Sequence, residues 1–313
     1  MMRAIACDDF GAADQLRERE IDIPPVGPND VLVRLAYAGV NPGDARIRQG
    51  QFVPMGRHVF PLVLGLEGAG TVEAIGMSGS PFEVGQTVYG WFMHDYVGDG
   101  TYAEYAPTRS RHLVAVPDGV SLREAAAVSC AGGTAMVLVE ELLKVAPGDT
   151  VVVLGAAGGV GHFAVQLAAA AGAHVIAVAR TSNHQFVREL GARDVIDYQT
   201  EDVQAAIQNL AFGGVDFAID TVGGDAQSSL AGIVRRGGRI ASCVHPPTTT
   251  IFADRDQQVV FDFLEHTPER LARLNEHFTA GRLRPRISGE YALADAAQAH
   301  AAIDVGVTVA RSF

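Results

Sequence analysis

The stretch TVVVLGAAGGVG, residues 150–161, decides the fold of the region around it. Residues 151–154 are apolar without polar alternation, which is typical of a strand buried on both faces of a parallel sheet. Glycines follow with the spacing Ala156-x-Gly158-x-x-Gly161, and the alanine-rich segment up to residue 171 predicts a helix. Strand, glycine turn and helix in this order predict a βαβ unit of a doubly wound sheet.

The glycine turn is a one-residue variant of the GxGxxG pattern, with alanine at its first position. Where side chains are absent, backbone N–H groups can approach a pyrophosphate, and the N-terminus of the following helix adds partial positive charge. The alternative is that the glycines serve only tight packing of helix on strand. The position between a buried strand and a helix start favours dinucleotide binding. The predicted contacts are Ala156, Ala157, Gly158, Gly159, Val160 and Gly161.

The second predicted strand, residues 174–179, ends beside a group of polar side chains that bears on cofactor choice. An acidic residue at this point accepts a hydrogen bond from the ribose of NAD, whereas a cation accommodates the 2′-phosphate of NADP. The sequence offers Arg180, Ser182 and His184 here, and residues 180–184 include no acidic side chain. It therefore predicts NADPH, with a solvated arginine at a strand end as the alternative.

The chain divides into a β-rich first part and an α/β second part. Up to about residue 121, short β-rich segments separated by Gly and Pro predict a compact, mostly antiparallel, barrel-like domain. Its predicted strands are 31–38, 70–75, 87–90 and 101–106. The expected domains are 1–122 with 267–313, and 123–266 as the dinucleotide-binding domain. The fold class is thus α/β, and the tail from residue 284 is expected to return to the first domain.

The second part reads as helices that alternate with apolar strands. The predicted helices are 122–131, 135–143, 159–171, 184–190, a segment near 227–234, and 268–280. The predicted strands are 150–154, 174–179, 195–197, 217–220 and 239–243, with 259–264 as an edge strand.

Composition excludes several classes of function. Lys and Arg total 24 against 36 Asp and Glu, so the formal net charge is −12 and no long basic run attracts nucleic acid or anionic lipid. No apolar run reaches the ~18 residues of a membrane span, and residues 1–7 lack a signal-peptide pattern. The cysteines, Cys7, Cys130 and Cys243, lie far apart and indicate neither a disulfide framework nor a structural zinc lobe. We expect a soluble cytoplasmic protein without membrane or nucleic-acid partners.

Eight further motifs carry a family resemblance. They are GVNPGD (39–44), PLVLGLEGAGTV (61–72), GQTVYG (85–90), GTYAEY (100–105), AGGTA (131–135), LGA with IDY (190–198), DTVGG (220–224) and GGRI (237–240). In this order the chain resembles the zinc-free quinone oxidoreductase (zeta-crystallin-like) branch of the medium-chain dehydrogenase/reductase superfamily. The resemblance spans nearly the whole length and implies a GroES-like substrate domain, a Rossmann domain and an active site in the cleft between them. We also expect a homodimer paired through the edge strand.

The resemblance assigns expected roles to single residues. Asn41 is expected to donate a hydrogen bond to the substrate oxygen or to hold the nicotinamide ribose, and Thr134 is expected to open a helix beside the nicotinamide. Tyr198 matches a position near the adenosine phosphate, with strand packing as the equal alternative. Val222 lies in the DTVGG motif, and His245 follows the predicted strand 239–243, where a nicotinamide contact is plausible.

The zinc positions of related alcohol dehydrogenases fall on Asn41, Leu66 and Cys130. Only Cys130 could bind a metal, whereas a catalytic zinc needs three protein ligands. Gly43 stands where those enzymes carry a hydroxyl relay. The resemblance therefore implies a zinc-independent enzyme, in which hydride addition is easiest onto a quinone or an α,β-unsaturated carbonyl that delocalises the arriving charge.

The proton donor is less well defined. Bacterial relatives often carry tyrosines after the NP motif, where this chain has Ala45 and Phe52. His94 and Tyr96, in a loop expected to border the cleft, can both transfer protons, with ordinary solvent exposure or packing as the alternative. Asp44 and Glu67 are expected to be structural, Asp44 fixing its loop and Glu67 making a buried hydrogen bond.

Two other functions stay open at this point. One is a narrow enoyl reductase of a biosynthetic pathway, and the other is a non-catalytic NADPH-binding sensor or structural protein. The C-terminus, VGVTVARSF, lacks a lysine that relatives carry near their end, which weakens any expectation of a cofactor contact from the tail.

Overall fold

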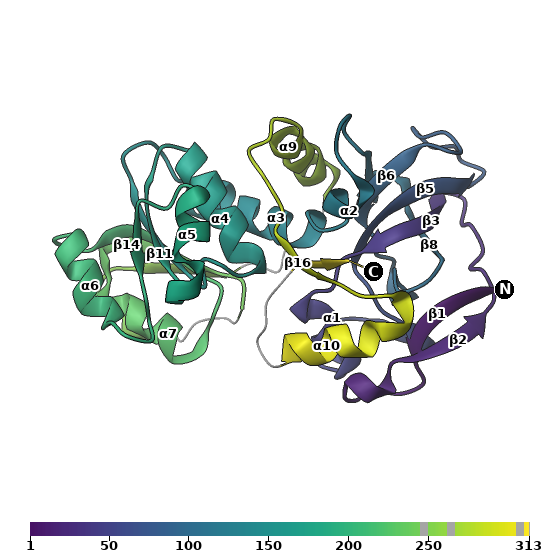
Figure 1. The fold of residues 1–313 in the computed structure, drawn as a ribbon, viewed down its shortest axis with the longest axis horizontal. Helices are drawn as coiled ribbons and strands as arrows, with labels where there is room; N and C mark the ends of the chain where they lie inside the picture. The colour runs from purple at the N-terminus through teal and green to yellow at the C-terminus, as the bar shows by residue number, and fades with distance from the viewer. Residues whose placement is uncertain (245–249, 262–266, 305–309, 313) are drawn as a thin grey trace. The chain divides into compact units, whose positions relative to one another are not determined.

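The computed structural model describes residues 1–244, 250–261, 267–304 and 310–312, drawn as a ribbon in Figure 1. They form two compact units. The first contains Met1–Gly133 and the described parts of His266–Thr279 and Arg284–Phe313; the second contains Thr134–Glu265, as far as it is described, and Ala280–Leu283. Within these residues, no helix combines the length and the apolar character that crossing a bilayer requires.

The first unit contains a two-stranded parallel sheet of β16 (Ile287–Glu290) and β17 (Ala310–Ser312) and is otherwise built on two larger sheets. One has the order β8-β3-β5-β6-β9 and is antiparallel throughout; the other has the order β2-β1-β4-β7, with a parallel pair between β4 and β7. The strands are β1 (Met2–Cys7), β2 (Arg17–Ile21), β3 (Asp30–Ala38), β4 (Arg57–Val63), β5 (Glu67–Ile75), β6 (Thr87–Trp91), β7 (Tyr96–Asp99), β8 (Tyr105–Arg109) and β9 (Leu113–Ala115).

The strand predicted at residues 101–106 is wrong for most of its length. β8 begins only at Tyr105. Residues 101–104 cross between the sheets instead: Glu104 N–H donates to Arg3 O of β1 at 3.0 Å, and Glu104 O accepts from Leu35 N–H of β3 at 2.9 Å. The extended backbone of these residues therefore forms hydrogen bonds with both sheets and belongs to no strand of either sheet.

Short helices pack against the sheets of the first unit. α1 (Pro42–Arg48) was not predicted, because its seven residues are too few for a clear period; Pro42 starts it and Asn41 caps it. The yellow helix α10 (Ala296–Asp304) lies beside α1 and the turn Ala13–Gln15 (Figure 1). α9 (Pro268–Thr279) packs on β9, as its apolar face requires, with Leu271, Leu274 and Phe278 buried.

The second unit is a parallel sheet with helices on both faces, which confirms the doubly wound prediction. Among the described residues its order is β12-β11-β10-β13-β14-β15. The strand order reverses at β10, so the carboxyl end of β10 is the switch point at which such sheets bind ligands. The strands are β10 (Thr150–Leu154), β11 (His174–Val178), β12 (Asp194–Ile196), β13 (Val215–Asp220), β14 (Val234–Ser242) and β15 (Gln258–Phe261).

The helices of this unit cover both faces of the sheet, as the alternation of strands and helices along the chain predicts. One face of the sheet packs against Ile207 of α6 (Val203–Leu210) and Phe252 of α8 (Thr250–Ala253). On the other side, β10 and β11 pack against α4 (Gly159–Ala170), and Arg239 of β14 donates to the carbonyls of Leu142 and Leu143 in the π-helical segment η4 (Val137–Leu143). The remaining helix between β11 and β12 is α5 (His184–Glu189).

Two predictions in the second unit need correction. The helix predicted near 227–234 is α7 (Gly224–Ser229), which ends five residues earlier. A 3₁₀ turn at Leu230–Gly232 follows it and leads into β14, where Val234 already pairs with Val215. α6 was not predicted at all. The edge strand is β15, and residues 262–264 of the predicted segment lie outside the described residues.

The helix predicted at 122–131 is interrupted. α2 (Leu122–Ala125) starts as predicted, with Ser121 Oγ accepting from Glu124 N–H at 3.2 Å, but α3 (Ser129–Met136) begins a new helix that runs into η4. Thr134 therefore lies inside α3 and does not open a helix. The four-residue helix α2 ends in a tighter turn, in which Ala127 N–H donates to Glu124 O at 3.1 Å.

Candidate active site

The glycine turn after β10 has the geometry that a dinucleotide site needs. Gly158 caps α4, whose first backbone N–H groups have no acceptor within the helix and point toward the turn. A Cβ on Gly161 would lie 2.2 Å from Gly155 O, so this glycine allows helix and turn to pack closely. Gly161 therefore serves the close packing of helix on turn, and dinucleotide binding at the turn stays a prediction.

The loop after β13 lies against the same turn. A Cβ on Gly155 would lie 2.5 Å from Thr221 Oγ1 and 3.0 Å from Val222 Cγ2, so residues 221–222 border the glycines. Val222 is half-exposed at this edge of the sheet. The structure therefore brings Val222 and the glycine turn together within the second unit.

Asp220 shapes this loop, a role that the sequence did not reveal. Its carboxylate is fully buried and accepts hydrogen bonds from Val222 N–H and Gly223 N–H on one oxygen, at 2.9 and 2.8 Å. The other oxygen accepts from Gln227 Nε2 and Ser242 Oγ, at 2.7 and 2.8 Å. Four donors offset the cost of burying the charge. The aspartate of DTVGG marks the position, but only burial and partners show what it does.

The residues after β11 form a second polar group. Arg180 Nε donates to Tyr198 Oη at 2.6 Å, and both side chains are exposed. Asp197, the acidic residue beside them, is buried and accepts from Thr181 N–H at 2.8 Å and from the Thr181 hydroxyl, so it fixes the turn.

Two other predicted contacts lie near this turn. Ser182 is exposed in the 3₁₀ turn Thr181–Asn183, and His184 Nε2 lies 3.1 Å from Ala179 O. His245, the remaining predicted contact, lies outside the described residues.

In the first unit, Asn41 lies between two buried carboxyl groups. Its backbone N–H donates to Asp44 Oδ2 at 2.8 Å, and its side-chain Nδ2 donates to Glu67 Oε1 at 2.8 Å. Glu67 Oε2 accepts from Cys130 N–H at 2.7 Å. A Cβ on Gly39 would lie 2.3 Å from Glu67 Oε1, so Gly39 makes room for this carboxyl group. The side-chain amide of Asn41 therefore has one fixed orientation.

Burial changes the acidity of this cluster. It raises the pKa of Asp44 and of Glu67 to about 7, although the hydrogen bonds from Asn41 oppose the shift, and the charge of Asp44 contributes at Glu67. Burial, and then the charges of Glu67 and Asp44, hold the pKa of the Cys130 thiol well above its usual range. Cys130 is thus a protonated thiol at neutral pH.

The donor set at the family's zinc position does not fit zinc. Asn41 is engaged with Glu67, Leu66 has no donor atom, and Cys130 is a thiol where a thiolate is needed. The described part of the chain holds no group of three or more His, Cys, Asp and Glu side chains that could bind a metal ion.

His94 and Tyr96 line a small pocket of about 40 Å³ in the first unit. Its apolar wall includes Ile47, Leu64, Leu66, Phe92 and Val97. The two rings are stacked with centroids 5.4 Å apart. Tyr96 Oη donates to the Asp99 carboxylate, and burial together with this contact raises the pKa of Tyr96 well above its usual range. His94 Nε2 lies 3.0 Å from Pro107 O and must be its donor, because a carbonyl only accepts.

These contacts separate the two candidate proton donors. A phenol with a raised pKa that is already bonded to a carboxylate is a weak acid, so Tyr96 is a poor donor. The geometry places both side chains at the pocket, where the Nε2 proton of His94 is donated to Pro107 O. Thr134 is nearly buried in α3, on the same helix as Cys130.

Comparisons with known proteins agree with the division of the chain into a GroES-like part and a dinucleotide-binding part. Residues 27–118 match the model of the alcohol dehydrogenase GroES-like domain, and residues 159–262 match that of the zinc-binding dehydrogenase family. A quinone oxidoreductase of Pseudomonas aeruginosa is 31% identical over 96% of this chain and 95% of its own length.

Solved structures of similar proteins cover the whole chain. The quinone oxidoreductase of Coxiella burnetii superposes with a TM-score of 0.89 at 28% identity, over 100% of this chain and 98% of that one. A mycobacterial protein in complex with NADPH superposes with a TM-score of 0.88 at 29% identity, over 100% of this chain and 99% of that one. The chain therefore belongs to the quinone oxidoreductase branch of the medium-chain dehydrogenase/reductase superfamily, with a GroES-like domain and a Rossmann domain.

Proposed function

We propose that this protein is an NADPH-dependent, zinc-independent reductase that transfers hydride to quinones or α,β-unsaturated carbonyl compounds. The observation that carries the proposal is the Asn41 amide held by Glu67, because Asn41, Leu66 and Cys130 stand at the three positions where the resemblance places the zinc ligands of related enzymes. Without a Lewis acid, the acceptor itself must delocalise the charge that hydride brings, as quinones and enones do.

The choice of NADPH is supported by the polar group after β11. Arg180 and Tyr198 are exposed and bonded to each other, and Asp197 is occupied by Thr181, so no described carboxylate of this turn is left to receive a ribose hydroxyl. An arginine beside a phenol can bind a phosphate through charge-assisted hydrogen bonds. Similarity to a protein solved with NADPH points the same way.

The protein's own residues have three tasks in this reaction. The glycine turn and the N-terminus of α4 hold the pyrophosphate, and the loop shaped by Asp220 borders them. Asn41, oriented by Glu67, positions the nicotinamide ribose or the acceptor oxygen. The apolar pocket beside Phe92 and Leu66 excludes water. Bound NADPH supplies the hydride, and a reduced quinone can take its proton from water.

We further propose that the substrate is a small molecule and that the protein forms a homodimer through β15, which is an edge of the described sheet. Sedimentation analysis should give twice the mass of the chain. A monomer at micromolar concentration would rule out the dimer without affecting the reductase proposal.

The reaction is tested by NADPH consumption with three kinds of acceptor: quinones, conjugated enones and saturated aldehydes. Quinones or enones should be reduced at least about a hundredfold faster than saturated aldehydes, because only they delocalise the charge. Saturated aldehydes reduced as fast as enones would overturn the proposed substrate class. Binding of NADPH without consumption by any acceptor would instead support a non-catalytic protein or a narrow enoyl reductase.

A further inference from the structure

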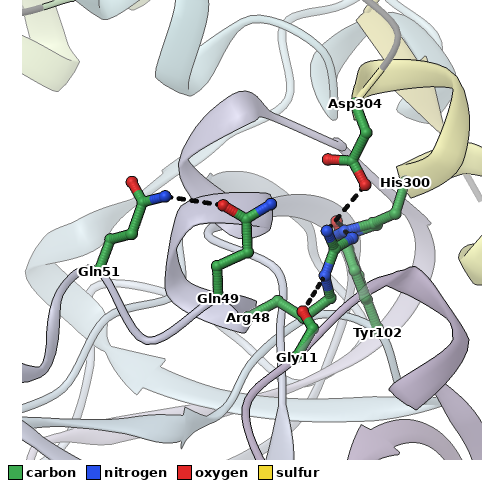
Figure 2. A network of polar contacts seen from close by, with 7 residues as sticks. All are labelled: Gly11, Arg48, Gln49, Gln51, Tyr102, His300 and Asp304. Atoms are coloured by element: carbon green, nitrogen blue, oxygen red, sulfur yellow. Dashed lines mark hydrogen bonds and ion pairs between the residues drawn. The ribbon is translucent and has the colours of Figure 1, made fainter.

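A buried arginine lies at the centre of a polar network outside the residues assigned so far. Figure 2 shows the Arg48 guanidinium between the Gly11 carbonyl and two side chains of α10. Nε donates to Gly11 O at 3.1 Å, Nη2 to Asp304 Oδ2 at 2.8 Å, and Nη1 lies 2.8 Å from His300 Nδ1. Arg48 and His300 are both fully buried. Helices α1 and α10 are therefore joined through this guanidinium.

The donors and acceptors of the network can be assigned without ambiguity. A guanidinium only donates, so His300 Nδ1 must accept, and the ring proton is on Nε2. His300 Nε2 lies 3.0 Å from Tyr102 Oη and is therefore the donor to it. The Tyr102 oxygen is thereby an acceptor, and its own proton is left for another group. The order of donation is Arg48 to His300 to Tyr102.

Asp44 is the group that this proton faces. Tyr102 is fully buried, and its interaction with Asp44 lowers the pKa of that carboxyl group against the effect of burial. The Tyr102 side chain forms a hydrogen bond with this buried carboxyl group. Oxygen Oδ2 of Asp44 also accepts from Asn41 N–H. The network thus reaches the cap of α1.

Burial and the neighbouring Arg48 charge keep the His300 ring neutral. Burial, and then the neighbouring Arg48 charge, lower the pKa of His300 to about 3, with Asp304 opposing them. The other described partner of the ring is Tyr102, which is uncharged. Asp44 in turn interacts with Tyr102. A single neutral tautomer is therefore expected across the physiological pH range.

We propose that His300 and Tyr102 are positioning residues of the active site, which transmit the orientation imposed by Arg48 and α10 to Asp44 and so hold Asn41 in place. This inference rests on the proposed function of Asn41. It assigns the C-terminal helix a role in the reaction through contacts that span 252 residues of sequence between Arg48 and His300. Neither side chain touches substrate or cofactor in this account.

The first experiment reads the tautomer directly and needs no activity. Histidine side chains labelled with ¹⁵N are observed by NMR between about pH 5.5 and pH 8, with His300 assigned through its scalar couplings and the His300→Gln variant. The proposal predicts a neutral Nε2–H ring that does not titrate. A His300 ring protonated on Nδ1, or one that becomes charged in this range, would overturn the network.

The second experiment asks whether Tyr102 acts through Asn41. Tyr102→Phe keeps the volume and removes the hydroxyl, and should lower kcat/KM about tenfold while the variant stays folded. In the Asn41→Ala background the same change should have an effect below about twofold, because the group that it positions is gone. Tyr105→Phe, which alters a half-buried tyrosine packed on the same core cluster, is the matched control and should leave kcat/KM unchanged.

Additive effects of Tyr102→Phe and Asn41→Ala would overturn the positioning role, since independent structural damage adds. If no acceptor consumes NADPH, the proposed function fails, and the same cycle is then read on the dissociation constant of NADPH. Non-additive losses of affinity would still support positioning of Asn41 toward the cofactor, whereas additive or absent losses would contradict it. The NMR result stands separately from both.

Discussion

Single residues decide how the candidate site differs from a metal centre. Glu67 is the central one, because its two oxygens receive the Asn41 amide and the Cys130 backbone N–H. The sequence predicted a buried structural hydrogen bond for Glu67, which the structure confirms. The raised pKa could not be predicted, because it depends on burial and on the charge of Asp44, neither of which a motif reveals.

The acidity of Glu67 gives a testable pH dependence of stability. An exposed glutamate has a pKa of 4.5, whereas the folded chain holds it at about 7. Between these values the folded chain binds more protons, so this contribution to stability is complete below about pH 4.5 and is lost as the pH rises to about 7. Glu67→Gln should reduce the fall in unfolding free energy between pH 5 and pH 8 by about 2 kcal/mol, measured by urea unfolding.

Glutamine can fit at this position, since it can accept from Cys130 and donate to an Asn41 amide that has turned over. The control is Glu83→Gln, which changes an exposed carboxyl group and should leave the pH dependence of the wild type intact. Equal pH dependence in the wild type and in Glu67→Gln would contradict the shifted pKa.

The predicted preference for NADPH over NADH depends on Arg180. Arg180→Ala removes the guanidinium that is proposed to bind the 2′-phosphate, so kcat/KM for NADPH should fall about tenfold or more while that for NADH stays within about twofold. Arg188→Ala, an exposed arginine of the neighbouring α5, is the control and should change neither value. Equal losses with both cofactors would mean that Arg180 does not read the phosphate.

At the scale of elements, periodicity and turn chemistry predicted what local sequence controls. β10, α4 and β11 begin at their predicted residues because each has a long apolar pattern bounded by Gly or a polar residue. α1 and α6 were missed, since helices of seven and eight residues span only about two turns and give too short a pattern to identify. Residues 101–104 look like a strand but cross between two sheets, a choice made by tertiary hydrogen bonds.

The contact between α4 and the glycine turn can be tested by one methyl group. Gly161→Ala would place a Cβ 2.2 Å from Gly155 O, a backbone atom that cannot move aside cheaply. The variant should lose about 2 kcal/mol of unfolding free energy and bind NADPH more weakly. Gly56→Ala adds a methyl group where no atom lies within 4 Å and should be neutral. Unchanged stability of Gly161→Ala would mean that helix and turn are not in close contact.

At the scale of the whole molecule, the family resemblance supplied what patterns could not. The doubly wound sheet followed from its buried strands, and the similarity to known quinone oxidoreductases confirms both domain types. The network of Arg48, His300 and Tyr102 was beyond reach, because isolated polar residues in a sequence look exposed until the fold buries them together. Tertiary contacts of this kind leave no local signal.

The central claim is that hydride moves from NADPH to a conjugated acceptor without zinc. The most direct measurement is the rate of NADPH oxidation with a simple quinone, using enzyme dialysed against a chelator and analysed for bound metal, with NADH in parallel. We predict undiminished turnover at less than about 0.1 zinc per chain and a preference of about tenfold or more for NADPH. Activity that disappears with the metal and returns with added zinc would contradict the account.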